Sequence, residues 1–298
     1  MTDRPTLTRH APAKINLALA VGPRCASDGM HPIASWMAPI SLFDTVTVQR
    51  LAECEPSRFE IIWAPDAMRP TPIDWPIEAD LAVRAVRAIE AEIEKPLPVA
   101  MRVEKRIPTG AGLGGGSSDA GAALLVVREL FGLDIPDDRL AAIASTLGSD
   151  VPFFLGDGPA LVTGFGETIT RTEPIAESGA IALLSPSFGC ATGAVYAAFD
   201  SMEPREFRSE GAERLANNAV LDDAGCFNDL AEAAERVDPS LAQMRAMIES
   251  AASIRAHITG SGSAMFVLCG DYAEAERVIE STRRFVGSIA GAVVSFRQ

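Results

Sequence analysis

Cysteine, histidine and lysine are scarce in this chain of 298 residues, and the first two scarcities argue against particular kinds of structural or metal site. The five cysteines are scattered and form no CxxC pair, which argues against a disulfide framework or a zinc site. The three histidines lack metal-ligand spacing, so we expect any metal to be held by oxygen atoms and substrate phosphates. Lysine occurs only at Lys14, Lys95 and Lys105, whereas arginine supplies the other basic residues.

Long apolar runs are missing as well. No stretch approaches the roughly 18 apolar residues that a membrane span needs, and the first residues lack the apolar core of a secretory signal. The formal net charge of −14 argues against nucleic acid or an anionic membrane as a partner. We therefore expect a cytoplasmic protein. We also expect a monomer or a weak homodimer, although neither observation bears on the oligomeric state.

The composition is otherwise that of a soluble globular protein, with 48% apolar and 22% charged residues. The length favours two domains over one, and the composition turns polar around TEPIAESG. We place the domains at 1–174 and 175–298. Strands and helices are mixed along the chain, which indicates an α+β fold with a sheet covered by helices.

Hydrophobic periodicity predicts the elements of the first domain. We expect strands over 7–22 and 58–62, a strand pair around Phe43 and Asp44, an irregular loop over 65–76 and a helix over 79–94. A clean alternation over 99–107 predicts a strand, a glycine loop follows it, and helices over 120–131 and 137–147 come next. A glycine-punctuated strand or hairpin over 160–170 closes this half.

The second domain opens with a buried strand over 180–186 and a loop that leads into a helix bearing Tyr196. Residues 201–225 are charged and predict mainly loop. Two helices broken at Pro239, a strand, turn and strand over 254–270, a helix over 271–285 and a last strand over 290–297 complete the chain.

The most informative stretch is KRIPTGAGLGGGSSDAGAALL, residues 105–125, in which a strand enters a glycine loop and the loop enters a helix. Its glycines permit positive φ and let a ligand approach the backbone closely. Ser117, Ser118 and Asp119 offer side chains that could cap the helix. An anion at this point would meet unpaired N–H groups and the positive end of the helix dipole.

The sequence of this loop does not match two familiar types of phosphate-binding site. Gly110, Gly112 and Gly115 satisfy the GxGxxG spacing of dinucleotide-binding folds, but a second helix follows where that fold needs a strand. The Walker pattern fails because no lysine follows Gly116. If phosphate binds here, backbone amides and serines hold it.

Three polar residues are ambiguous when taken alone. Lys14, in an otherwise apolar strand beside Asn16, could be a solvated edge residue. Asp150, between a helix end and Pro152, could be an ordinary turn residue. His31 lies in a turn-rich loop and is by default a polar surface residue.

Three stretches together resemble the GHMP kinases, the small-molecule kinases of galactose, homoserine, mevalonate and phosphomevalonate. They are PAKINL at 12–17, PTGAGLGGGSSDA at 108–120 and TGSGSAMF at 259–266. With SDGMHPI, LGSDVPFFL and FNDL added, the chain looks like the branch whose substrate is a methylerythritol linked to cytidine diphosphate.

The resemblance implies a ribosomal protein S5 domain 2-like N-terminal domain, a ferredoxin-like C-terminal domain and an active site in the cleft between them. It implies ATP and Mg²⁺, with Asp150 as catalytic base, Lys14 as its charge partner and Ser117 as a possible magnesium ligand. The residues that would hold ATP are Asp80, Pro108, Gly110, Gly112, Leu113, Gly114, Gly115, Gly116, Ser117 and Ser118. Those that would hold the substrate are Asn16, Met30, His31, Thr192, Tyr196, Gly260 and Ser261.

The expected chemistry suits these residue types. Phosphoryl transfer asks the protein to position groups and to neutralise charge around the γ-phosphate. A carboxylate within reach of the acceptor hydroxyl can take its proton, and a neighbouring ammonium would keep that carboxylate ionised.

The chain departs from the family pattern at two places. Met30 stands where the family usually has a tyrosine that stacks on the cytosine ring, and Tyr196 could supply the other face of a cytosine sandwich. Asp80 stands where the family commonly has an asparagine near the nucleotide. One alternative is a GHMP kinase for another alcohol, such as homoserine or a mevalonate. The other is a catalytically silent binding module that keeps the fold.

Overall fold

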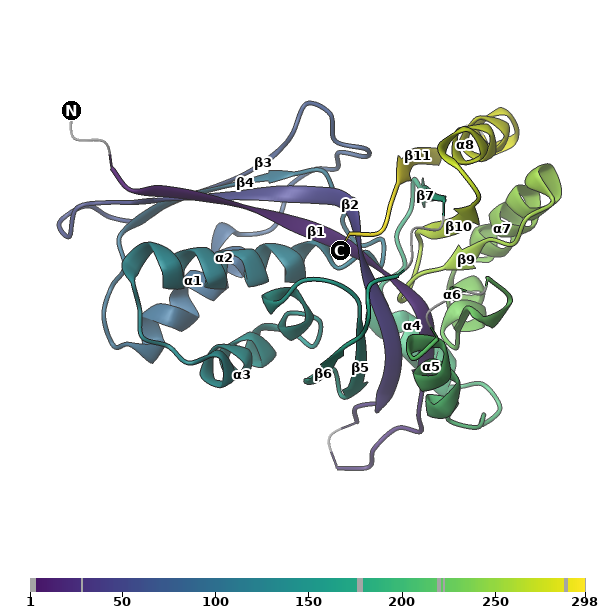
Figure 1. The fold of residues 1–298 in the computed structure, drawn as a ribbon, viewed down its shortest axis with the longest axis horizontal. Helices are drawn as coiled ribbons and strands as arrows, with labels where there is room; N and C mark the ends of the chain where they lie inside the picture. Colours follow the sequence, from purple (N-terminus) through teal and green to yellow (C-terminus); the bar gives the residue numbers. More distant parts are fainter. Residues whose placement is uncertain are drawn as a thin grey trace. The chain divides into compact units, whose positions relative to one another are not determined.

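The computed structural model describes residues 4–27, 29–175, 179–218, 221, 223–286 and 289–297. Two long strands, β1 (Thr6–Val21) and β2 (Ile33–Arg50), run through both compact units into which the chain divides (Figure 1). The first unit contains residues 4–13, 42–107 and 114–156, and the second contains residues 14–41, 108–113 and 157–297. No helix in the described part of the chain is long and apolar enough to cross a membrane.

In the first unit, helices cover one face of a sheet (Figure 1). β4 (Val99–Lys105) pairs antiparallel with residues Thr45 to Arg50 of β2 and parallel with β3 (Arg58–Trp63). The helical elements of this unit are η1 (Ile77–Ala79), α1 (Leu81–Glu92), α2 (Gly115–Phe131), α3 (Asp137–Leu147) and η2 (Pro152–Leu155). One face of α1 is buried in the core with the strands, as its periodicity predicts, and α2 is buried over Ser118 to Val127, as its almost wholly apolar sequence predicts.

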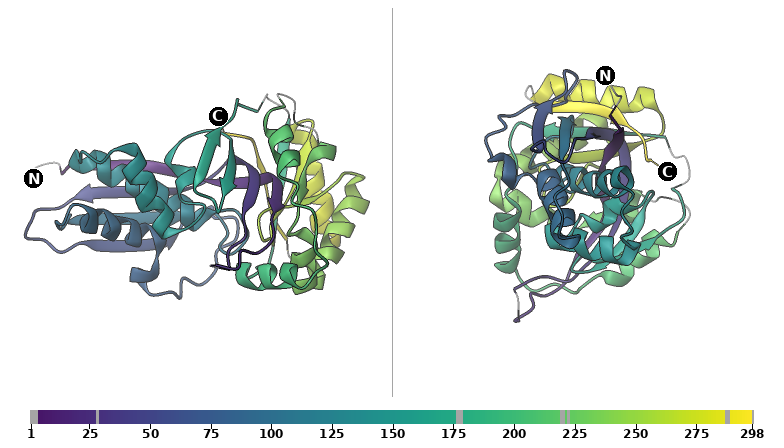
Figure 2. Two further views of the ribbon diagram at one scale, coloured as in Figure 1. Left: turned by 90° about the horizontal axis from the view of Figure 1, so that it is seen from below. Right: turned by 90° about the vertical axis from the view of Figure 1, so that its left-hand side faces the viewer.

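The second unit contains an antiparallel sheet of four strands in the order β11-β7-β10-β9. These strands are β7 (Ala180–Pro186), β9 (His257–Ile258), β10 (Met265–Cys269) and β11 (Ile289–Val294). α8 (Tyr272–Val286) packs on this sheet and contacts α7 (Pro239–Ala252), and the two helices lie side by side (Figure 2). The unit also contains β5 (Ala160–Gly164), β6 (Thr168–Arg171), α4 (Thr192–Asp200), α5 (Ser209–Ala216), η3 (Asp223–Gly225), β8 (Phe227–Asn228) and α6 (Ala231–Val237).

The order β4, α2, α3 confirms the predicted strand, glycine loop, helix and helix. A dinucleotide-binding fold would need a strand directly after α2. The predicted hairpin over 160–170 is confirmed as β5 and β6, and the helix break before Pro239 is confirmed between α6 and α7. Part of the segment in which we placed the domain boundary, 176–178, lies outside the described residues.

Three predictions about elements are wrong. The strand pair around Phe43 and Asp44 is one strand, β2, because its first half pairs with β5 and its second half with β4. Residues 201–225 contain the helix α5, which buries Ala212 and Leu215 within a charged sequence. Helix α2 begins at Gly115 and not at Ala120, since the last glycines of the loop already adopt the helical conformation.

Gly121 in α2 tests the packing of this helix against η2. A Cβ added there would lie 2.8 Å from Cβ of Phe154 and 3.2 Å from its carbonyl oxygen. We expect Gly121→Ala to lower the free energy of unfolding by about 1–3 kcal/mol, measured by urea denaturation. Gly193→Ala in α4 is the control, because a Cβ there meets nothing within 4 Å and alanine favours a helix; equal losses in both variants would contradict the packing argument.

Candidate functional site

The glycine loop between β4 and α2 has the backbone that its sequence predicts. Gly110, Gly112 and Gly114 have φ values of 66°, 78° and 72°, in the left-handed region that favours glycine. Gly114 is the N-cap of α2 and provides no side-chain cap. The predicted capping role of the serines and Asp119 is therefore wrong, because these residues lie inside the first turns of the helix. The N–H groups at the start of α2 are left for another acceptor.

The loop lies directly against the turn that begins at Thr259. A Cβ on Gly112 would lie 2.3 Å from the carbonyl oxygen of Thr259, closer than any side chain can approach. The N–H of Ala264 donates to the carbonyl oxygen of Ala111 at 3.0 Å. Two motifs that are far apart in the sequence, 108–113 and 259–264, therefore form one backbone surface.

Strand β1 brings the third motif to the same place. The N–H of Lys14 donates to the carbonyl oxygen of Leu113 at 2.9 Å, and Nζ of Lys14 donates to Oδ1 of Asn16 at 2.7 Å. A Cβ on Gly260 would lie 3.3 Å from Nζ of Lys14. Only 3% of Lys14 is exposed, so its interpretation as a solvated edge residue is wrong. The structure thus brings together Lys14, Asn16, Gly112 and Gly260, as the motif analysis predicts.

Asn16 is held by polar side chains that the sequence analysis missed. Its Nδ2 donates to Oγ of Ser35 at 2.8 Å, and Ser35 in turn donates to the carbonyl oxygen of Ala18. Its N–H donates to Oγ1 of Thr259 at 2.9 Å, and this hydroxyl donates back to Oδ1 of Asn16. The same Oδ1 accepts from Lys14. These bonds leave the amide one orientation, which fixes the ammonium group beside it.

Two side-chain contacts shape the Thr259 turn. Nδ2 of Asn228, in the FNDL motif, donates to the carbonyl oxygens of Ile258 and Gly260 at 2.9 and 2.8 Å. The hydroxyl groups of Ser261 and Thr192 are 3.0 Å apart, so these two predicted substrate residues lie together at the start of α4. The role of Asn228 as a clamp on this turn could be found only once the turn and β8 were placed in space.

His31 is buried, contrary to its interpretation as a surface residue. Nδ1 of His31 lies 2.9 Å from the carbonyl oxygen of Gly22, and Nε2 lies 3.0 Å from Oδ1 of Asp200 at the end of α4. The rings of Tyr196 and Phe199 lie 5.3 and 5.8 Å from the His31 ring. The structure therefore groups His31 and Tyr196, and it adds Asp200 and Phe199, which no motif had indicated.

Met30, next in the chain to His31, is 48% exposed. A thioether this exposed is open to contact with a ligand. Asp28 of the same DGMH loop lies outside the described residues.

The first unit contains the predicted site residues Asp80, Gly114, Gly115, Gly116, Ser117, Ser118 and Asp150, and the second unit contains Pro108. Asp80 is the N-cap of α1, where Oδ1 accepts from the N–H of Ala82 and Oδ2 from the indole N–H of Trp75. Leu81, next to it, lies 3.5 Å from a Cβ position on Gly116, so α1 and α2 begin close together. Ser117 is half-buried in the first turn of α2, and Asp150 is half-buried in the turn after α3. Lys14 and Asp150 belong to different units, and their pairing stays a prediction.

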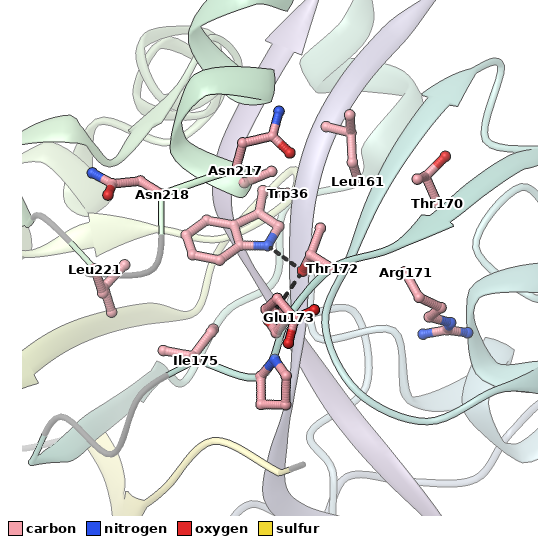
Figure 3. A pocket seen from close by; sticks show the side chains of 12 residues that line it. Trp36, Leu161, Thr170, Arg171, Thr172, Glu173, Ile175, Asn217, Asn218 and Leu221 are labelled. Carbon is pink, nitrogen blue, oxygen red and sulfur yellow. Dashed lines mark hydrogen bonds between the residues drawn. The ribbon is translucent and has the colours of Figure 1, made fainter.

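A separate cavity of about 290 Å³ lies beside Trp36 and the end of β6 (Figure 3). The Trp36 indole N–H donates to Oγ1 of Thr172 at 3.2 Å, and Asn217 and Asn218 lie across from it. None of the predicted site residues lines this cavity. The motif residues of the second unit gather around Lys14 instead.

The chain belongs to the GHMP kinase family. The model of the GHMP kinases N terminal domain matches residues 80–158, and that of the GHMP kinases C terminal matches residues 205–287. As a member of this family the chain is a kinase, and the family implies ATP as its phosphoryl donor. The domain boundary at 174/175 stays a prediction.

Similar proteins place the chain within the family. A 4-diphosphocytidyl-2-C-methyl-D-erythritol kinase of Polaromonas sp. is 39% identical over 87% of this chain and 82% of the relative. A kinase of the same name from Porphyromonas gingivalis is 36% identical over 86% of this chain and 89% of the relative.

Solved structures share the fold. The crystal structure of a 4-(cytidine 5'-diphospho)-2C-methyl-D-erythritol kinase has a TM-score of 0.70 and 31% identity, and the match covers 97% of this chain and 99% of the other. The homoserine kinase from Cytophaga hutchinsonii also has a TM-score of 0.70, at 14% identity and with 100% and 97% coverage. This second likeness shows the fold alone. The predicted two-domain GHMP kinase fold is confirmed.

Gly112 and Gly110 form a matched pair that tests the contact between the loop and the Thr259 turn. Both have positive φ, so alanine at either position costs about 1–2 kcal/mol of backbone strain. A Cβ on Gly110 meets nothing within 4 Å, whereas one on Gly112 meets the Thr259 carbonyl. We expect Gly112→Ala to be the more destabilising of the two in urea denaturation and to weaken nucleotide affinity more strongly. Equal effects would show that the close approach is unimportant.

Proposed function

We propose that this kinase transfers the γ-phosphoryl group of ATP to the 2-hydroxyl of 4-diphosphocytidyl-2-C-methyl-D-erythritol, giving the 2-phosphate and ADP. This reaction belongs to the non-mevalonate route to isoprenoid precursors. The names of the similar proteins support the choice of substrate. The observation that carries the proposal is the convergence of Lys14, Asn16, the glycine loop and the Thr259 turn in one backbone surface.

The phosphates of ATP would bind to the glycine loop. Five of the residues 110–116 are glycines, whose N–H groups a ligand can approach closely, and the first turn of α2 adds N–H groups and the positive end of its dipole. Pro108 and Leu113 are buried residues of the same segment, and Ser117 and Ser118 follow it in the helix. Asp80, as the cap of the neighbouring helix α1, would lie towards the nucleoside.

Lys14 and Asp150 would carry out the chemical step. The oxygen of the 2-hydroxyl attacks the γ-phosphorus, the bond to the β-phosphate oxygen breaks, and ADP leaves with that oxygen. The carboxylate of Asp150 accepts the hydroxyl proton as the new bond forms. The ammonium of Lys14, fixed by Asn16, offsets negative charge that develops on the transferred group.

Magnesium would accompany the nucleotide. The half-buried hydroxyl of Ser117, in the first turn of α2, is an oxygen ligand of the kind that Mg²⁺ accepts, with phosphate oxygens and water completing its shell. The ion would neutralise charge on the β- and γ-phosphates. The protein's own part is to hold the loop, the hydroxyl groups and Lys14 in place.

The cytidine part of the substrate would be bound near His31. Tyr196 offers an aromatic face beside the buried imidazole, and the exposed Met30 offers a thioether. Thr192 and Ser261 present hydroxyl groups, and Asn16 and Gly260 lie beside Lys14. These seven residues form the proposed substrate site.

A panel of acceptor alcohols tests the proposal. In a coupled ADP-release assay, we expect turnover with 4-diphosphocytidyl-2-C-methyl-D-erythritol and none above background with homoserine or mevalonate. Because tyrosine offers a larger stacking face than methionine, Met30→Tyr should lower KM for the cytidine substrate and leave KM for ATP unchanged. Turnover with homoserine or mevalonate alone would assign another alcohol, and binding of the cytidine substrate without ADP release would indicate a non-catalytic relative.

Asp150→Asn tests the assignment of the base. The amide cannot accept the hydroxyl proton, so we expect turnover to fall by about 10²–10⁴-fold or more while ATP affinity is retained. Asp134→Asn is the matched control, since Asp134 is an exposed carboxylate between α2 and α3. Retained turnover in Asp150→Asn, measured by ADP release, would remove Asp150 from the mechanism.

A further inference from the structure

Three buried charged residues lie at the base of the glycine loop: Asp44 on β2, Lys105 at the end of β4 and Asp119 in α2. Each is at most 3% exposed. Nζ of Lys105 donates to Oδ2 of Asp44 at 2.6 Å and also to Oδ2 of Asp119. We call these residues the buried triad. None of them was predicted as a site residue, and the proposed chemical step uses none of them.

The triad contacts both ends of the loop. Oδ1 of Asp44 accepts from the N–H groups of Arg106 and Ile107, the two residues that precede Pro108. Asp119 is part of the first turns of α2, into which the loop runs. Lys105 therefore links the strand end, through Asp44, to the start of the helix, through Asp119.

The space around these contacts is tight. A Cβ on Gly115, the first residue of α2, would lie 3.0 Å from Ile107 and 3.7 Å from Oδ2 of Asp44. The strand end and the helix start thus approach each other with no room for a side chain. The ion pairs of Lys105 with Asp44 and Asp119 span the same separation.

Stabilisation of the folded state is a poor explanation for the presence of the buried triad. Burying two carboxylates and one ammonium costs free energy that apolar residues of the same volume would not cost. Burial and the nearby charge of Asp44 raise the pKa of Asp119 well above its usual range. Burial acts to lower the pKa of Lys105, but the charges of Asp119 and Asp44 outweigh it and raise that pKa, so the ammonium stays charged. The cluster contains two carboxyl groups and only one ammonium group. Selection for stability alone would not favour such a buried imbalance.

We propose that the buried triad positions the glycine loop for ATP, with Asp119 and Lys105 as positioning residues that fix the distance between the end of β4 and the start of α2. The inference rests on the proposed binding of ATP phosphates by this loop. Without the link between Lys105 and Asp119, the strand end and the helix start can move apart. The N–H groups of the loop then lose the spacing that phosphate oxygens require.

Asp119→Ala and Asp119→Asn test this proposal as a pair. Both remove the charge, but asparagine keeps an oxygen that accepts from Nζ of Lys105 and alanine does not. We expect Asp119→Ala to weaken the affinity for a non-hydrolysable ATP analogue by about tenfold or more, and Asp119→Asn to stay close to wild type. The affinities are measured by calorimetry with Mg²⁺ and without acceptor alcohol, alongside the Tm of each protein.

Val127→Ala is the control for stability, because Val127 is fully buried in the same helix, beyond the residues that contact the loop. It should lower Tm and leave nucleotide affinity unchanged. If Asp119→Ala does not fold, Asp119→Leu fills the same space and leaves Lys105 paired with Asp44, and the same loss of affinity is expected.

Wild-type nucleotide affinity in the folded Asp119→Ala or Asp119→Leu protein would overturn the proposal, as would an equal loss of affinity in Val127→Ala. A wild-type protein that binds no nucleotide would instead defeat the proposed function.

Discussion

The close approach of Gly112 to the carbonyl oxygen of Thr259 is the constraint on which the site depends. Only a residue without a side chain can stand there, and only a loop with positive φ can present it. Because these two backbones touch, Lys14 reaches Leu113 through its N–H, and Asn16 reaches Thr259. The arrangement supplies directed N–H groups and one buried ammonium, which is what a reaction dominated by positioning and charge neutralisation requires.

The two buried lysines of this chain have different side-chain partners. The chain has a formal net charge of −14, yet two of its lysines are buried, Lys14 in the second unit and Lys105 in the first. Lys14 is held by an amide and is proposed to face the transferred phosphoryl group, whereas Lys105 is paired with carboxylates beneath the loop. Carboxylates neutralise the charge of Lys105, whereas the role proposed for Lys14 is to offset negative charge on the transferred group.

Local patterns predicted much of the fold and part of the site. The alternation in β1 placed Lys14 and Asn16 on one face, and the element order excluded a dinucleotide site. The break expected near Phe43 was wrong because β2 exchanges one partner strand for another without interruption, with Pro39 inside it. The expected serine caps were wrong because Gly114 in the left-handed conformation starts the helix. Asp200, Asn228 and Asp119 act through partners distant in sequence, and one sequence contains no signal for such pairs.

The central claim is that the glycine loop and the Thr259 turn form one phosphate-binding surface. Amide hydrogen exchange followed by mass spectrometry, with and without a non-hydrolysable ATP analogue and Mg²⁺, tests it most directly. The account predicts that the nucleotide slows exchange together in peptides covering 108–118 and 259–264. Unchanged exchange in both peptides, with protection instead around the cavity beside Trp36, would contradict it.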